Sequence, residues 1–281
     1  MFSNDSSRAS SEGTNTEMKD AAVRQPRKGL YVLPNLFTLA ALFGGFYAIV
    51  MAMEGRFEQS VLGIFCAMVL DSLDGRVARM THTQSAFGEQ MDSLSDMVSF
   101  GAAPALVMYE WALRGLGRWG WVAAFVYCSC AALRLARFNT NIGVVDKRYF
   151  QGLPSPGAAA LVVSFIWIMD SAGIKGLREG PWLGWTAFGV TLYAGLTMVT
   201  NVPFYSFKDL SLKRSVPFVV IVAIALMIAV ITVHPPIVLF SIFLAYGLSG
   251  YGVYLWKRLK GRPVSVIATS TDEPDEVGLH R

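Results

Sequence analysis

Four aspartates lie at helical spacings inside a stretch of chain that is otherwise mostly apolar. Asp71 and Asp74 are three residues apart. Gly88, Asp92 and Asp96 then follow at intervals of four residues. Residues three or four apart share one face of a helix, so these spacings predict two acidic helix faces. Charged side chains in an apolar span cost about 2.5–3.5 kcal/mol each on insertion scales, and for that reason they usually mark a functional site.

The residue types indicate chemistry on a phosphate. Four carboxylates packed together cannot all stay ionised unless a cation compensates their charge. Oxygen ligands suit Mg²⁺ or Mn²⁺, and two such ions form the usual clamp for a phosphoryl displacement. Gly75 and Gly88 allow a nucleotide or diphosphate to approach the backbone, and Arg79 offers a planar fork to a phosphate. The alternative interpretation is a solvated loop that carries incidental acids.

The elements that must position these aspartates are long apolar segments. The chain has 281 residues, of which 53% are hydrophobic and 16% charged, and its mean hydropathy is +0.44. The runs are continuously apolar and reach the roughly 20 residues that a membrane-spanning helix needs, which excludes a barrel. We predict an all-α integral membrane protein, a polytopic bundle of about eight transmembrane helices. The predicted spans are 31–53, 57–79, 86–112, 119–138, 156–174, 182–201, 215–233 and 236–256.

The organisation along the chain follows from these spans. We predict a disordered cytoplasmic tail at 1–29, a catalytic transmembrane core at 30–201, a C-terminal transmembrane helix pair at 202–256 and a cytoplasmic tail at 257–281. Only His234 and Pro235 separate the last two spans, which predicts an antiparallel hairpin. Small residues such as Gly44 and Gly45 indicate close helix packing.

The distribution of lysine and arginine predicts the orientation. Of the 24 such residues, 19 would lie on the side of both termini. The five on the opposite side of the membrane would be Arg56, Arg114, Arg118, Lys175 and Arg178. This asymmetry is typical of a cytoplasmic location for the termini, here in a bacterial inner membrane. The short connection at 81–85 makes the second and third spans antiparallel neighbours, so the aspartates meet near the cytoplasmic face. The net charge of +4 is too small to indicate nucleic acid as a partner.

The acidic stretch resembles the signature of the CDP-alcohol phosphotransferases, also called CDP-alcohol phosphatidyltransferases. The matching positions are Asp71-x2-Asp74-Gly75-x2-Ala78-Arg79-x8-Gly88-x3-Asp92-x3-Asp96. These membrane enzymes join a CDP-activated group to an alcohol and release CMP. The resemblance implies a core of six transmembrane helices, to which this chain adds two C-terminal ones, a homodimer, and an active site that opens to the cytoplasm.

The resemblance also implies roles for the residues. Asp71, Asp74 and Asp92 would coordinate the divalent cations, which we expect to be two Mg²⁺ or Mn²⁺ ions. Asp96 would complete the metal site and act as general base on the acceptor hydroxyl. The pocket for CDP-diacylglycerol, the expected lipid donor, would be lined by Gly75, Ala78, Arg79 and Gly88.

A second group of residues suggests the acceptor. Arg134, Arg137 and Asn139, followed by the stretch 150–156, are similar to the membrane-embedded phosphatidylserine synthases of this family. One arginine could hold the carboxylate of L-serine and the other a phosphate, while Asn139 orients a substrate. Alternatively, both arginines anchor the helix at membrane lipid headgroups. The stretch 150–156 either closes over the site or shapes the entry to the next span.

The predicted function is transfer of a phosphatidyl group from CDP-diacylglycerol to L-serine, giving phosphatidylserine and CMP. Glycerol 3-phosphate or an inositol compound is the alternative acceptor. A prenyltransferase also uses paired aspartates, but it lacks the glycine and arginine frame of this stretch. A transporter or ion channel would use the acids as an ion path. At the start of the first span, Asn35 and Thr38 either contact the nucleotide or make a helix cap and an interhelical hydrogen bond.

Overall fold

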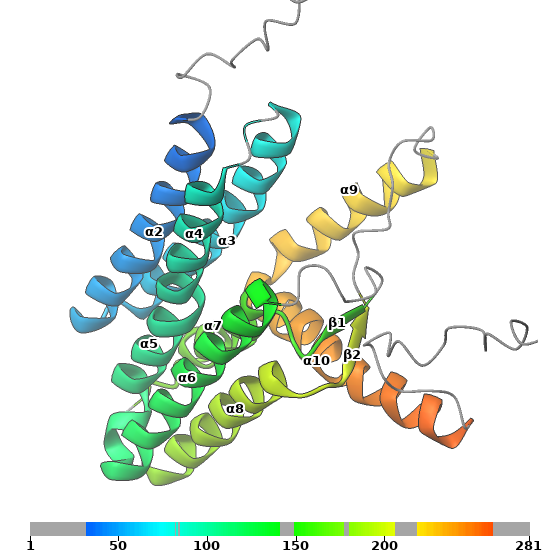
Figure 1. The fold of residues 1–281 in the computed structure, drawn as a ribbon. Helices are drawn as coiled ribbons and strands as arrows, with labels where there is room; N and C mark the ends of the chain where they lie inside the picture. Colours follow the sequence, from blue (N-terminus) through cyan, green and yellow to red (C-terminus); the bar gives the residue numbers. More distant parts are fainter. Residues whose placement is uncertain are drawn as a thin grey trace, which may run out of the picture.

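The computed structural model describes residues 32–81, 83, 85–140, 149–176, 180–205 and 218–260, which are almost entirely helical (Figure 1). The helices are α2 (Val32–Met53), α3 (Phe57–Met80), α4 (Ala86–Asp96), the π-helix η2 (Met97–Ala102), α5 (Ala103–Trp111), the 3₁₀ helix η3 (Leu113–Leu116), α6 (Arg118–Thr140), α7 (Ser155–Ser171), α8 (Pro181–Val199), α9 (Phe218–Val233) and α10 (Pro235–Leu259). In the described ranges, β1 (Tyr149–Gln151) and β2 (Pro203–Tyr205) pair antiparallel. Every predicted span coincides with a helix, or with the continuous rod α4–η2–α5. The predicted tail at 1–29 and the part of the other tail beyond Lys260 lie outside the described residues.

The surface of the bundle is that of a membrane protein. Four of the described helices, α2, α6, α8 and α10, contain segments long and apolar enough to cross a membrane. Large apolar side chains point outwards along α2, where Leu36, Phe43 and Phe46 are 58%, 67% and 58% exposed. A soluble protein rarely exposes such a continuous apolar surface, whereas lipid tails accommodate it. The chain is therefore an all-α integral membrane protein.

Helices α2 and α3 pack closely against each other. A Cβ placed on Gly44 would lie 3.0 Å from the carbonyl oxygen of Gly63, and one on Gly63 would lie 3.0 Å from that of Gly44. Small residues of this kind let two helix backbones approach. Ser60 adds a hydrogen bond from its Oγ to the carbonyl oxygen of Ala48, at 2.7 Å. The prediction that the glycines of the first span pack helices is thus confirmed.

The rod α4–η2–α5 changes its helical geometry directly after Asp96. Pro104 has no N–H to give to the carbonyl oxygen of Phe100, four residues earlier, so a regular α-helix would leave that oxygen without its usual bond. The π-turn absorbs the break, and the hydroxyl of Tyr127 on α6 donates to the oxygen of Phe100 at 3.1 Å. On the other side, Ser99 Oγ donates to the carbonyl oxygen of Ala41 at 3.0 Å. The rod is therefore fixed between α2 and α6.

The predicted antiparallel hairpin of the last two helices is wrong. Helices α9 and α10 diverge from the turn that joins them in Figure 1. Helix α10 packs instead on α7 and β2: the ring of Phe204 abuts Gly250 and lies 5.6 Å from that of Tyr246, centroid to centroid. In α9 the described side chains, such as Leu226, are mostly exposed. Contacts with the core thus fix α10 in a direction that the turn alone does not determine.

Candidate active site

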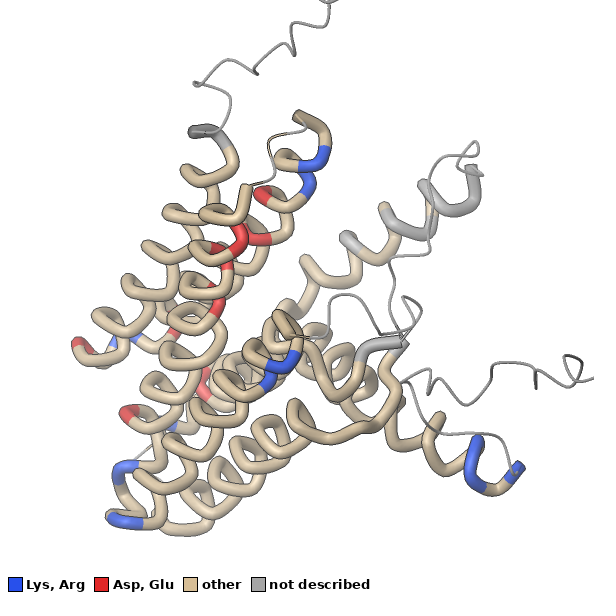
Figure 2. Tube along the Cα trace, in the orientation of Figure 1, with Lys and Arg blue, Asp and Glu red and all other residues tan. Residues whose placement is uncertain are grey.

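Three of the four predicted aspartates form one cluster. Carboxylate oxygens of Asp71, Asp74 and Asp92 all lie within 4.8 Å of one another. The first two come from the C-terminal part of α3 and the third from α4, and Figure 2 shows the acidic positions of these neighbouring helices at similar heights. Ser85 caps the N-terminus of α4, where its Oγ accepts a hydrogen bond of 3.0 Å from the amide of Gly88. An all-oxygen cluster of this size fits a hard divalent cation.

Helix α2 supports the cluster from a third side. Thr38 Oγ1 donates to Asp74 Oδ2 at 2.8 Å. Both side chains are buried, at 4% and 5% exposure, so little water competes for this bond. Ser95 Oγ on α4 donates to the carbonyl oxygen of Thr38 at 3.1 Å, which ties α4 to the same point of α2. The interhelical hydrogen bond was one of the two interpretations of Thr38, and it is confirmed.

Asp96 lies beside the cluster, at the last residue of α4. Its electrostatic neighbours are the acidic Asp71 and Asp92 and the basic Arg134 of α6. Its Oδ1 is buried and has no hydrogen-bond partner among the described residues. A buried polar atom without a partner is costly and rare, which makes this oxygen a candidate to bind a cation or a hydroxyl group.

The glycines of the signature differ in their surroundings. A Cβ on Gly75 would meet nothing within 4 Å in the part of the chain that the structure describes. The guanidinium of Arg79 folds back over this position, because its Nε donates to the carbonyl oxygen of Gly75 at 2.9 Å. A Cβ on Gly88 would lie 3.4 Å from Asn35 Oδ1 of α2. Ala78 is partly buried on the same turn of α3. Gly75 and Arg79 therefore border open space near the aspartates, whereas Gly88 borders α2.

Arg134 is the arginine that the fold brings to the aspartates. It projects from α6, and its Nη1 donates to Ser155 Oγ at 2.6 Å. Ser155 is the first residue of α7 and is fully buried. With Asp96 as its acidic neighbour, Arg134 puts a positive charge directly beside the acidic cluster.

Arg137 and Asn139 have structural partners elsewhere. Arg137 donates from Nη1 to Asn201 Oδ1 at 3.0 Å and from Nη2 to the carbonyl oxygen of Val199 at 2.8 Å. It therefore ties α6 to the C-terminal end of α8. The exposed Asn139 donates from Nδ2 to Ser93 Oγ on α4 at 3.0 Å. The sequence motif thus contains one arginine at the cluster and one arginine that joins two helices.

The stretch 150–156 shapes the entry to α7, which is one of its two predicted roles. The amide of Gly152 donates to the carbonyl oxygen of Val202 at 2.9 Å, and that of Leu153 donates to Thr197 at 3.1 Å. Gly152 has a φ of 76° and abuts the carbonyl oxygen of Met198, a position that suits only glycine. This turn sets Ser155 opposite Arg134, a contact that the sequence does not reveal because nothing in its spacing links the two.

The fold and the site agree with the comparisons to known proteins. Residues 31–199 match the CDP-alcohol phosphatidyltransferase family, so the chain belongs to this family.

Several relatives carry the name CDP-diacylglycerol–serine O-phosphatidyltransferase, and three of them illustrate the similarity. The one from Helicobacter pylori (strain J99) is 35% identical over 233 residues, which cover 82% of this chain and 93% of the relative. The one from Mycobacterium tuberculosis (strain H37Rv) is 31% identical over 226 residues, covering 77% and 76%. The archaeal relative from Methanocaldococcus jannaschii is 33% identical over 189 residues, covering 67% and 82%.

Proposed function

We propose that this protein transfers a phosphatidyl group from CDP-diacylglycerol to the hydroxyl of L-serine, giving phosphatidylserine and CMP. Membership of the family and the shared name of the relatives support this reaction. The observation that carries it in this chain is the buried, unpartnered Oδ1 of Asp96, a residue whose electrostatic neighbours are Asp71, Asp92 and Arg134.

In the proposed reaction Asp96 accepts the proton of the serine hydroxyl. The serine oxygen forms a bond to the phosphorus that bears diacylglycerol, and the bond from this phosphorus to the CMP oxygen breaks. Asp71, Asp74 and Asp92, with Asp96, would hold two divalent cations, Mg²⁺ or Mn²⁺. Bound there, the cations would balance the negative charge of the diphosphate and of departing CMP.

The substrate pockets follow from the neighbours of each side chain. Arg134 is the better candidate for the serine carboxylate, because it is next to Asp96, whereas both terminal nitrogens of Arg137 already bond to the end of α8. The nucleotide would lie along α3 and α4, against Gly75, Ala78, Arg79 and Gly88. Asn139 would support the site through its bond to α4 rather than touch a substrate.

The proposal includes an orientation and an assembly. Of the 24 lysines and arginines in the sequence, 19 would lie on the side of the termini and the aspartates, although Figure 2 shows basic positions at both ends of the bundle. This supports a cytoplasmic active site in a bacterial inner membrane. The family resemblance supports a homodimer, with CDP-diacylglycerol entering from the inner leaflet.

The test is CMP release by the purified protein in detergent with CDP-diacylglycerol and Mn²⁺ or Mg²⁺. We expect release only when serine is added, and not with glycerol 3-phosphate, inositol or no acceptor. Asp96→Asn should abolish release and retain CDP-diacylglycerol binding. The control is Glu110→Gln, because Glu110 is an acid of α5 that pairs with Arg114. This substitution should leave CMP release unchanged.

Each other outcome overturns a defined part of the proposal. An active Asp96→Asn variant would exclude its role as the base. Release with another acceptor would support the reaction class but exclude serine as the acceptor. If no acceptor supports release by the folded, metal-loaded protein, ion flux in liposomes would then test the transporter alternative.

A further inference from the structure

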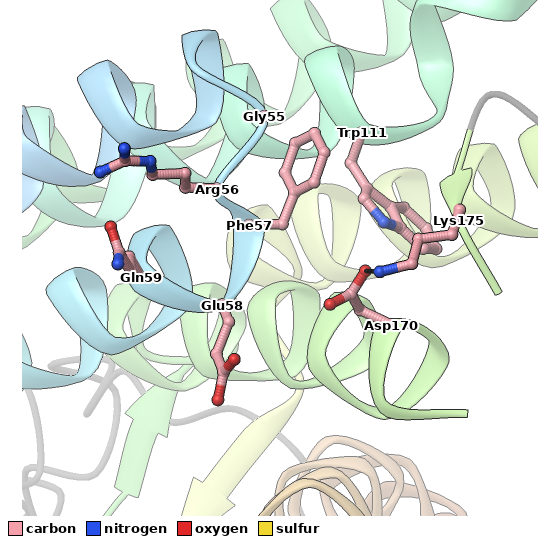
Figure 3. A pocket seen from close by; sticks show the side chains of 8 residues that line it. All are labelled: Gly55, Arg56, Phe57, Glu58, Gln59, Trp111, Asp170 and Lys175. Carbon is pink, nitrogen blue, oxygen red and sulfur yellow. Dashed lines mark ion pairs between the residues drawn. The ribbon is translucent and has the colours of Figure 1, made fainter. Parts of the chain in front are cut away.

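A cavity of about 540 Å³ lies at the opposite end of the bundle from the aspartates. Figure 3 shows the residues that line it: Gly55, Arg56, Phe57, Glu58, Gln59, Trp111, Asp170 and Lys175. They come from the α2–α3 turn, the start of α3, the end of α5, the end of α7 and the segment after it. Asp71 follows Phe57 by 14 residues on the same helix, a separation of about 21 Å at the rise of an α-helix. The cavity is therefore distinct from the acidic cluster.

Trp111 puts an unused hydrogen-bond donor into the wall of this cavity. Its side chain is 1% exposed, and its Nε1 has no acceptor in the described ranges of the chain. In Figure 3 the indole nitrogen points toward the pair formed by Asp170 and Lys175. A buried indole N–H normally has a partner, so an unpaired one beside a cavity indicates that a bound molecule supplies the acceptor.

The charges around the cavity are of both signs. Arg56 and Lys175 contribute two cations, and Glu58 and Asp170 contribute two carboxylates. Lys175 Nζ lies 3.8 Å from Asp170 Oδ1, and the side chain of Lys175 is 62% exposed. Exposed ion pairs of this kind are weak and can exchange partners when a ligand arrives. A wall with two charges of each sign complements a zwitterion better than it complements a simple anion.

The position of the cavity indicates which kind of zwitterion it binds. Helix α2 ends at Met53 and α3 begins at Phe57, so the cavity lies where a membrane bundle meets the headgroup layer. Phe57 adds an apolar wall suited to the glycerol end of a lipid. We propose that the cavity binds the headgroup of a phospholipid that carries a phosphate and a primary ammonium, from the leaflet opposite the aspartates. The phosphate contacts Lys175 and the indole N–H, and the ammonium contacts Glu58 and Asp170. The exposed side chain of Arg56, which lies on the other side of Phe57 in Figure 3 and pairs with Glu54 at 3.5 Å, turns inward to reach the phosphate.

The test uses the full-length protein with each lipid titrated in detergent, and lipid retention is measured by native mass spectrometry. We expect phosphatidylethanolamine to bind more tightly than phosphatidylcholine, whose ammonium has no N–H, or phosphatidylglycerol, which has no ammonium. Trp111→Phe keeps the ring and removes the donor, and should weaken phosphatidylethanolamine binding by about tenfold. Arg56→Gln should weaken it similarly, and its exposed side chain makes misfolding no concern. The matched control is Arg114→Gln, because Arg114 is as exposed as Arg56, 62% against 61%, but lies outside the cavity.

Three results would overturn this inference. The first is equal retention of the three lipids, and the second is wild-type binding by both Trp111→Phe and Arg56→Gln. The third is binding of free phosphoethanolamine as tight as that of the lipid, which would assign the cavity to a soluble molecule. Serine-dependent CMP release from CDP-diacylglycerol should persist in both variants without added phosphatidylethanolamine, so failure of this site is distinguishable from failure of the proposed reaction.

Discussion

Thr38→Val tests whether α2 holds the acidic cluster in its binding geometry. The threonine hydroxyl has one proton and two acceptors within reach, Asp74 Oδ2 at 2.8 Å and the carbonyl oxygen of Pro34 at 3.2 Å. The shorter bond goes to a carboxylate, which is the stronger acceptor when ionised, so the hydroxyl of Thr38 donates its hydrogen bond to Asp74. Valine keeps the shape and removes the donor. A hydrogen bond to a charged group contributes about 1.5–3 kcal/mol, which corresponds to about a 10- to 150-fold loss of cation affinity.

The assay is CMP release as a function of Mn²⁺ concentration at saturating substrates. We expect Thr38→Val to raise the Mn²⁺ concentration at half-maximal CMP release by about 10- to 150-fold. Thr38→Ser, which keeps the hydroxyl, should restore the wild-type value. Thr191→Val is the matched control: Thr191 is also fully buried, but its Oγ1 donates to the carbonyl oxygen of Ala187 within its own helix, at 2.7 Å. A Thr38→Val variant with the wild-type midpoint would refute the idea that this bond positions Asp74.

Two further predictions compare matched pairs of variants. Arg134→Lys should raise the KM for serine at least about tenfold, because lysine cannot keep both the Ser155 bond and a bidentate carboxylate contact. Arg137→Lys should change the KM for serine much less. Equal effects of the two substitutions in steady-state kinetics would contradict the assignment of Arg134 to the serine carboxylate. Gly45→Ala should lower the thermal unfolding midpoint, since its Cβ would lie 2.7 Å from the Cα of Ser99, and overpacking typically costs about 1–3 kcal/mol. Gly189→Ala, in a helix position where a Cβ meets no described atom within 4 Å, should not lower the thermal unfolding midpoint. If both variants lowered the midpoint equally, the close approach of Gly45 to Ser99 would be refuted.

The spans and the aspartate cluster could be predicted from the sequence because both depend on local patterns. A continuous apolar run indicates a membrane helix wherever that helix packs, and the spacings of Asp71, Asp74 and Asp92 place them on faces that a short connection must bring together. The supporting bonds are different. The partners Thr38–Asp74 and Arg134–Ser155 are separated by 36 and 21 residues, and only the packed bundle decides that they meet. The direction of α10 was missed for the same reason.

The position of Asp96 shows why the irregular rod matters for the proposed reaction. A π-turn contains an extra residue, so the faces of the rod before and after it are out of phase. Ser95 and Ser99, on either side of the start of this turn, both donate to carbonyl oxygens of α2. Asp92 and Asp96 remain free to face α3 and α6. The buried oxygen of Asp96 opposes folding while it is unpartnered, but the bonds of Ser95, Ser99 and Tyr127 hold the rod in place. The carboxylate is therefore oriented before any substrate arrives, which is the condition for an efficient general base.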